Sequence, residues 1–269
     1  QQKQLEETHY ELIEKNEEVL ASIRYAQTIQ SAMLPSFKSL QENIKNFFLI
    51  FKPKDIVSGD FYWFKKLDDG FLLAVADCTG HGVPGSMISM MGSSILDEAV
   101  LSQGLRDTGR ILTYLNSKMI EGLNKRDSSS ENRDGMDICL IRIIYSDTSE
   151  VGLQFSGAKR PLYLLNDSEL NTIRGDRNSI AGEKHLDTDF DFSTNKSLLK
   201  AGSKLFLTSD GFVDQMGEEG KKYGTKRLKQ LLGVNRSFDN IQEELEAEFT
   251  SHIGLEDQRD DVTILGIEV

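Results

Sequence analysis

Short apolar segments that lead into or out of an acidic residue recur four times in this chain, and they constrain its fold more than any other feature. The four runs are residues 58–61 (Ser-Gly-Asp-Phe), 72–82 (LLAVADCTGHG), 205–211 (LFLTSDG) and 259–263 (RDDVT). Apolar runs of this length beside turn residues are typical of buried strands. A carboxylate at a strand end, beside a glycine that lets backbones approach closely, is a common element of oxygen-rich metal sites. We therefore expect several strand ends to meet at one edge.

The residue types in these runs also indicate which metal such a site would hold. A single Asp-Gly after a strand is ordinarily a turn, but four acidic strand ends in one chain favour ligation. The chain has only two cysteines, Cys78 and Cys139, and no cluster of histidines. Hard oxygen donors without a sulfur or imidazole cluster favour Mg²⁺ or Mn²⁺ over zinc. Residues 80–85 (GHGVPG) lack the Gly-Lys-Ser/Thr ending of a phosphate-binding P-loop.

The order of the remaining patterns predicts an α+β fold with mainly antiparallel sheets. We expect strands over 47–51, 60–64, 71–76, 137–145, 151–155, 161–165, 204–208 and 262–269, and helices over 84–101, 107–123, 225–232 and 238–252. The turn at 67–70 indicates a hairpin packed beside the first strand, and residues 127–135 form a polar loop. Strands interleaved with pairs of helices, rather than in strict alternation, favour layered α+β architecture.

The first 33 residues contain neither glycine nor proline and predict one long helix. Its apolar positions fall seven residues apart, at Leu5, Leu12, Val19, Ala26 and Met33. This spacing is typical of a coiled-coil seam, so we expect residues 1–34 to be a linker helix that forms a parallel homodimer. Asn16 interrupts the stripe, either as a buried residue that sets the register or as a solvated position on a single amphipathic helix. Pro35 ends the helix.

The charge balance excludes some classes of partner. The chain has 31 Lys and Arg against 43 Asp and Glu, a net charge of −12. A polyanion would be repelled, which argues against nucleic acid and against direct membrane contact. No run approaches the ~18 apolar residues of a membrane helix, and the first residues carry no signal peptide. We expect this segment to be cytoplasmic, although a longer protein could be membrane-anchored upstream.

Four motifs together carry a resemblance to a known family. Residues 54–62 (KDIVSGDFY), 75–82 (VADCTGHG), 208–211 (TSDG) and 260–263 (DDVT) resemble the SpoIIE-type branch of the metal-dependent protein phosphatases (PPM, protein phosphatase 2C-like). The resemblance covers 46–269, the expected phosphatase domain. It implies a four-layer α-β-β-α sandwich with two Mn²⁺ or Mg²⁺ ions per active site. Two such ions can activate a bridging hydroxide for attack on a phosphoester, here of phosphoserine or phosphothreonine.

The resemblance also implies roles for individual acidic residues. Asp77 would bridge both metals, and the backbone carbonyl of Cys78 would bind the second. Asp210 and Asp260 would complete the shell of the first metal. Asp60 would act nearby, directly or through a metal-bound water, so that Asp60 and Asp77 are the expected catalytic residues. Asp261 would support the ligands without binding a metal itself.

Phosphate binding has less clear candidates in the sequence. The eukaryotic branch of the family uses an arginine ahead of the first acidic motif, and none stands there in this chain. Lys54 and Lys159 are the proposed phosphate-binding residues, with Lys52 and Arg160 as further cations that could meet the phosphate. His81 could serve as general acid, but the resemblance favours a structural role in the loop that follows the metal-binding strand.

These inferences lead to one main hypothesis and two rivals. The main one is the output domain of a bacterial signalling protein, which receives its signal from an upstream sensor through the N-terminal helix. The resemblance suggests a phosphorylated regulatory protein as substrate, such as an anti-sigma-factor antagonist. The first rival is a non-catalytic PPM-fold interaction module. The second is a two-metal phosphodiesterase acting on nucleic acid, which would need a basic track that this acidic chain lacks.

Overall fold

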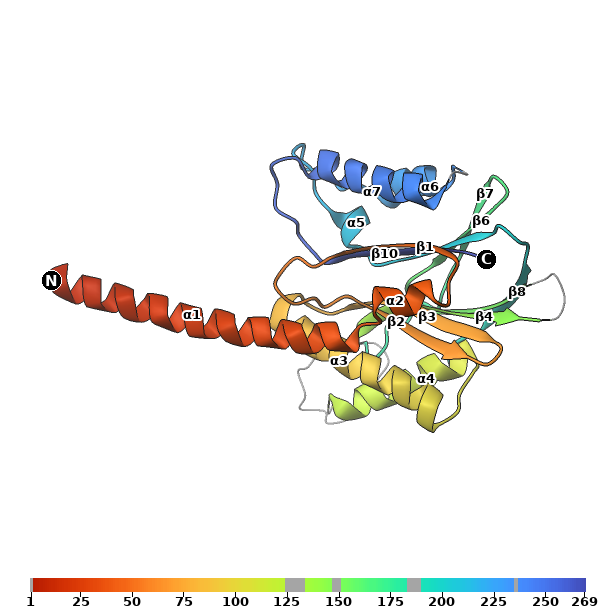
Figure 1. The fold of residues 1–269 in the computed structure, drawn as a ribbon, viewed down its shortest axis with the longest axis horizontal. Coiled ribbons are helices and arrows are strands. Elements are labelled where there is room, and N and C mark those ends of the chain that lie inside the picture. The colour runs from red at the N-terminus through yellow and green to blue at the C-terminus, as the bar shows by residue number, and fades with distance from the viewer. Residues whose placement is uncertain (1, 124–133, 147–150, 183–189, 235–236) are drawn as a thin grey trace.

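Two β-sheets stacked face to face between pairs of helices form the body of the molecule, and a long helix projects from it (Figure 1). The structure is a computed structural model that describes residues 2–123, 134–146, 151–182, 190–234 and 237–269. The helices are α1 (Gln2–Met33), α2 (Phe37–Gln41), α3 (Gly82–Asp97), a π-helical turn η1 (Glu98–Ser102), α4 (Thr108–Gly122), α5 (Gly211–Asp214), α6 (Thr225–Leu232) and α7 (Phe238–Ile253). The strands are β1 (Asn46–Lys52), β2 (Phe61–Leu67), β3 (Gly70–Cys78), β4 (Met136–Tyr145), β5 (Val151–Ala158), β6 (Leu162–Asn166), β7 (Glu169–Ile173), β8 (Asn195–Leu199), β9 (Lys204–Thr208) and β10 (Val262–Glu268).

Each sheet has five strands, and every pair of neighbouring strands is antiparallel. The first sheet has the order β1-β10-β9-β6-β7 and the second β2-β3-β4-β5-β8. Helices α3 and α4 cover the outer face of the second sheet, while α6 and α7 lie over the first (Figure 1). The predicted four-layer α-β-β-α sandwich is therefore confirmed.

Alternation along the strands explains how four layers share three hydrophobic cores. In β3, Leu73 and Val75 pack in the core between the two sheets, whereas Leu72 and Ala74 pack in the core beneath α3 and α4. Successive side chains of a strand point to opposite faces, so a strand buried on both faces reads as a continuous apolar run. This is why the run before Asp77 contains no polar residue.

The main differences from the sequence-based expectations lie at the sheet edges, and the short helices α2 and α5 were not predicted either. Strands β7 and β8 were not predicted, because each is short, three of its five residues are polar, and neither contains a continuous apolar run. The first strand does not lie beside the β2–β3 hairpin in one sheet: β1 pairs with β10 in the other sheet. Most of the predicted polar loop at 127–135 lies outside the described residues.

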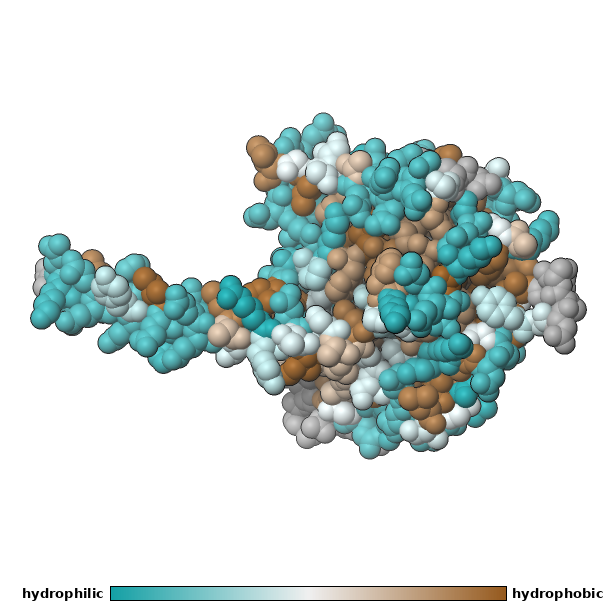
Figure 2. All heavy atoms as spheres, in the orientation of Figure 1, coloured by the Kyte–Doolittle hydropathy of each residue, from teal (hydrophilic) through white to brown (hydrophobic). Residues whose placement is uncertain are grey.

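Helix α1 confirms the predicted long N-terminal helix, which ends before Pro35. Its seam positions are open to solvent in the single chain: Leu5 is 70% and Leu12 66% exposed. Figure 2 shows a largely hydrophilic projecting helix with isolated hydrophobic side chains along it. Within the described part of α1, Gln30 is the one buried residue. No described helix combines the length and apolar character needed to cross a bilayer.

Candidate active site

Antiparallel pairing brings the four acidic segments to one end of the sandwich. In the second sheet β2 begins directly after Asp60, and its first residue lies opposite Ala76, next to Asp77. In the first sheet β10 pairs with β9, so that the residues just before β10 lie beside those just after β9. Because the start of one strand lies beside the end of its antiparallel partner, Asp260 and Asp210 lie at the same end of the sheet. The predicted convergence of strand ends is what the backbone shows.

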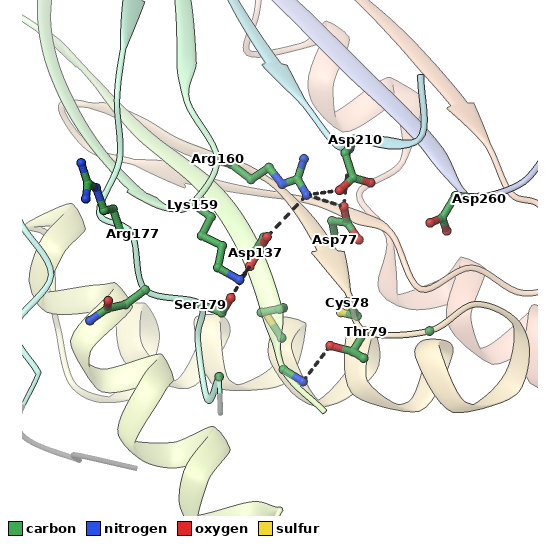
Figure 3. Close-up of a pocket in the computed structure, with 15 residues that line it drawn as sticks. Asp77, Cys78, Thr79, Asp137, Lys159, Arg160, Arg177, Ser179, Asp210 and Asp260 are labelled. Atoms are coloured by element: carbon green, nitrogen blue, oxygen red, sulfur yellow. Dashed lines mark hydrogen bonds and ion pairs between the residues drawn. The ribbon is translucent and has the colours of Figure 1, made fainter. Parts of the chain in front are cut away.

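A cavity of about 720 Å³ opens at this end and contains most of the predicted metal ligands. Asp77, Cys78, Asp210 and Asp260 line it, together with Lys159, which was predicted to bind phosphate (Figure 3). The structure therefore brings together residues that are separated by up to 183 positions in the chain, from Asp77 to Asp260.

Asp60 and Asp261 lie behind the cavity wall and are almost completely buried. The Asp60 carboxylate accepts a hydrogen bond from Thr263 Oγ1 at 2.7 Å. The Asp261 carboxylate accepts the backbone N–H groups of Lys54 and Gly59, each at 2.7 Å. Asp261 thus fixes the backbone immediately before Asp60, and so helps to hold the Asp60 carboxylate in position.

The loop that carries Asp60 is also held from the side of the N-terminal helix. Gln30 Oε1 accepts the Ser58 N–H at 3.0 Å, and Gln30 Nε2 donates to the Ser58 carbonyl at 2.6 Å and to Ser89 Oγ at 3.0 Å. On the opposite side a Cβ added to Gly59 would lie 2.4 Å from the carbonyl oxygen of Gly80. Glycine is required there because two backbone segments meet in contact.

The carboxylates repel one another and lie partly or wholly out of water. Burial raises the pKa of Asp60 to about 7 from an ordinary value of 3.8. Burial, followed by the charge of Asp60, raises the pKa of Asp77 well above its usual range. Burial also raises the pKa of Asp260. A group of carboxylates in this state favours either protons or a bound cation.

Arg160 supplies a positive charge within this group. Its Nη2 atom lies 3.0 Å from Asp77 Oδ2, 2.5 Å from Asp210 Oδ2 and 3.5 Å from Asp137 Oδ2 (Figure 3). Burial would raise the pKa of Asp210, but the pairing with Arg160 outweighs it and lowers that pKa. Burial would lower the pKa of the Arg160 guanidinium, but the carboxylates together outweigh it and raise that pKa, so the group stays charged.

Asp137 and the central position of Arg160 were missed at the level of sequence. Asp137 lies directly opposite Asp77 in the β3–β4 ladder. A signal for it existed, since an aspartate opens the apolar strand that follows the polar loop, as in the other acidic motifs. Arg160 was named only as one of several cations, because nothing in the sequence shows which of them the fold would bury.

The donor set fits divalent metals by chemistry and by position. Carboxylates from several strand ends and the region of the Cys78 carbonyl surround one cavity, and three of the carboxylates already share one cation, Arg160. Among the described residues, no three Asp, Glu, His or Cys side chains stand close enough together to enclose an ion as they are oriented. A metal that binds Asp77 and Asp210 would have to displace the Arg160 guanidinium from them.

The other predicted residues occupy different positions around the site. Lys159 Nζ lies 3.7 Å from Asp137 Oδ1, within the cavity wall. Lys54 Nζ lies 2.8 Å from His81 Nε2, and His81 Nδ1 lies 2.6 Å from Asp55 Oδ2. Lys54 and His81 do not line the cavity, so the structure separates them from Lys159.

The two cysteines are buried free thiols. Burial is the main cause that raises the pKa of Cys78, and the same holds for Cys139. A thiol with a raised pKa is a poor nucleophile, since the thiolate is the reactive form.

Comparison with known proteins agrees with this geometry. The SiaA-PP2C domain of Pseudomonas aeruginosa is 31% identical, with 95% of this chain and 98% of that chain covered and a TM-score of 0.81. The PP2C phosphatase domain of SpoIIE from Bacillus subtilis, solved with a fragment of its regulatory domain, is 21% identical, with 83% and 62% covered and a TM-score of 0.63. RsbX in complex with magnesium shares the fold at 20% identity, with 83% and 94% covered and a TM-score of 0.56. A search of curated proteins finds no match.

The fold and the acidic cavity between the sheet ends define a PP2C-type protein-serine/threonine phosphatase domain. The family model described as "Stage II sporulation protein E (SpoIIE)" matches residues 68–269. The chain belongs to the SpoIIE family.

Proposed function

We propose that this chain removes phosphate from phosphoserine or phosphothreonine of a regulatory protein with the help of two divalent metal ions. The observation that carries the proposal is the gathering of Asp77, Asp210 and Asp260 around one cavity, with a guanidinium among them. Mg²⁺ and Mn²⁺ both suit this donor set. RsbX, which shares the fold, was solved with magnesium, which favours the same class of cofactor here.

The residues that would hold the metals are those that line the cavity or support it. Asp77 would contact both ions, the Cys78 carbonyl one of them, and Asp210 and Asp260 the other. Asp60 would complete the site from behind, and Asp261 would hold the Asp60 loop in place. When bound, paired divalent cations supply Lewis acidity that lowers the pKa of water and neutralises phosphoryl oxygens.

Cationic side chains of the chain itself would orient the phosphate. Arg160 offers a fork of N–H donors that matches phosphate geometry, and it lies among the carboxylates rather than at the surface. Lys159 lies in the same wall and would add a second positive charge. Since both thiols are buried with raised pKa values, attack by water without a covalent phosphoenzyme is the mechanism that the side chains favour.

The chain organisation suggests how the activity is controlled. We propose that residues 1–34 are a signalling and dimerisation helix and that residues 46–269 are the phosphatase domain. The exposed seam of α1 suits pairing with a second copy in a parallel coiled coil. An upstream sensor would act through this helix, and the substrate would be a phosphorylated regulatory protein such as an anti-sigma-factor antagonist.

Phosphate release from a phosphoserine protein, measured with Mn²⁺ and with EDTA, tests the enzymatic proposal. The wild type should be active only with metal, and Asp210→Ala should lose activity by roughly 10²-fold or more, as for removal of a key electrostatic group. Asp214→Ala is a matched control, because Asp214 lies four residues later and its carboxylate pairs with Lys222 at 3.0 Å. Equal phosphate release by wild type and Asp210→Ala would support the non-catalytic module instead.

A further inference from the structure

A second cavity of about 520 Å³ adjoins the acidic one. Lys159, Arg160 and Arg177 line both cavities, so the two are neighbours across a common wall. Figure 3 shows this wall, with Arg177 on the side of Lys159 that faces away from Asp210. A substrate whose phosphate reaches Arg160 would therefore extend toward the second cavity.

The second cavity is strongly basic. Among the described residues that line it, the cationic side chains are Lys159, Arg160, Arg174, Arg177 and Lys229, against one carboxylate, Asp176. This concentration is unusual in a chain with a net charge of −12. A local patch of one sign in a chain of the opposite sign attracts ligands that the rest of the surface repels.

Two of these cations are available for a ligand. Within the described parts of the chain, neither Arg174 nor Arg177 forms an ion pair, and both side chains are exposed. The carboxylate of Asp176 is already engaged, since its Oδ2 accepts the Ser193 N–H at 2.8 Å and the Ser193 hydroxyl at 2.9 Å. The Asp176 carboxylate is thus directed toward Ser193, and among the described residues it forms no ion pair with Arg174 or Arg177.

The backbone fixes this basic rim in place. The Lys159 N–H donates to the Asp176 carbonyl, and the Asp176 N–H donates to the Gly157 carbonyl, each at 2.7 Å. A Cβ added to Gly175 would lie 2.4 Å from the Gly157 carbonyl oxygen, so the two segments touch through glycine backbones. Lys159 itself has a φ of 56°, in the left-handed region that is unfavourable for a residue with a side chain. Such strain persists where surrounding contacts enforce it, and it is common at binding sites.

We propose that the second cavity binds acidic residues that flank the phosphoserine of the substrate protein. This inference rests on the proposed function, because it places the phosphate beside Arg160 and the flanking residues beside Arg174 and Arg177. An extended peptide advances about 3.3 Å per residue, so residues adjacent to the phosphoserine enter the adjoining cavity. Carboxylates are the expected partners, since guanidinium groups bind them through two parallel hydrogen bonds.

Charge reversal at one exposed arginine tests the docking site. Three phosphoserine peptides would be compared, with Asp/Glu, Ala or Lys at the flanking positions, together with p-nitrophenyl phosphate, which has no flanks. Arg174→Glu should raise KM for the acidic peptide about tenfold, the effect of losing one exposed ion pair and gaining one repulsion. It should lower KM for the basic peptide and leave p-nitrophenyl phosphate unchanged. Arg110→Glu, on α4, is the matched control.

Two outcomes separate this inference from the proposed function. If Arg174→Glu changes KM for the acidic, neutral and basic peptides by the same factor, or if its KM values equal those of Arg110→Glu, the docking inference is wrong while phosphatase activity stands.

Binding of labelled peptides that carry a non-hydrolysable phosphonate, measured by fluorescence anisotropy, tests docking without turnover. A wild type that binds the acidic phosphonate peptide more tightly than the basic one, yet hydrolyses no substrate, would keep the docking site and reject the phosphatase. Equal affinity of the wild type for both peptides would overturn the docking site.

Discussion

The amide of Gln30 hydrogen-bonds the projecting helix to the phosphatase body, and its removal should lower the free energy of unfolding. Ser58 is fully buried, and both its N–H and its carbonyl bond to Gln30. In Gln30→Leu the Ser58 N–H loses its acceptor, whereas the carbonyl keeps a longer bond from Ser89 Oγ at 3.4 Å. An orphaned buried donor costs about 1–3 kcal/mol, and each lost hydrogen bond adds about 1 kcal/mol.

The expected loss for Gln30→Leu is therefore roughly 2–4 kcal/mol in the free energy of unfolding. For a domain of this size that corresponds to a fall in Tm of roughly 4–16 °C. Trp63 is the only tryptophan in the chain and is 2% exposed, so its fluorescence reports the melting of the phosphatase body. Because Ser58 lies two residues before Asp60, weaker binding of Mn²⁺ by calorimetry should accompany the loss of stability.

Gln27→Leu is the matched control, because it makes the same chemical change on an exposed position of the same helix. It should leave Tm within about 1–2 °C of the wild type, as is usual for surface substitutions. Equal melting curves for Gln27→Leu and Gln30→Leu would show that the buried amide does not stabilise the loop, and the reasoning from unsatisfied backbone groups would fail.

Three further predictions concern the Asp60 carboxyl, the contact at Gly175 and the exposed seam of α1. With EDTA present, the free energy of unfolding should fall as pH rises from about 4 to 7. Burial raises the pKa of Asp60 to about 7, so in this range the folded chain holds a proton that the unfolded chain releases. Urea titrations across that range should show a flatter slope for Asp60→Asn, and identical slopes would contradict the assignment. Gly175→Ala should lower Tm more than Gly92→Ala, since the added methyl meets backbone at 2.4 Å in the first and a flexible methionine end at 2.5 Å in the second. A chain without residues 1–25 should sediment as a monomer and the full chain as a dimer; equal monomeric masses would exclude the coiled coil.

The acidic cavity could be predicted because its signal lies within short segments. Asp77 lies near the end of β3, directly after the apolar run 71–76, and Asp210 lies two residues after β9, whose three central residues are apolar. Each apolar run predicts its strand without reference to the rest of the chain. When the strands pair in antiparallel fashion, the strand ends that carry these residues can lie only at one or the other end of the sheet. The sheets were recognisable for the same reason, since buried strands have a distinct composition.

The positive half of the site could not be predicted in this way. The position of Arg160 depends on hydrogen bonds between the Gly157–Lys159 turn and Asp176, which is a tertiary contact. Edge strands β7 and β8 gave no signal, because partly or fully exposed edge positions accept polar residues as readily as loops do. The location of β1 beside β10, in the sheet that does not contain the β2–β3 hairpin, likewise depends on long-range pairing rather than on local pattern.

The charges of the site link metal binding, phosphate binding and docking to one another. Asp77 and Asp210 are paired with Arg160 in the structure, so a metal that takes these carboxylates would free the guanidinium for a phosphoryl group. A freed guanidinium in a wall shared with the basic cavity would then favour an anionic substrate on both sides of that wall. Metal and phosphoprotein should therefore strengthen each other's binding, because each one compensates the charge that the other leaves unpaired.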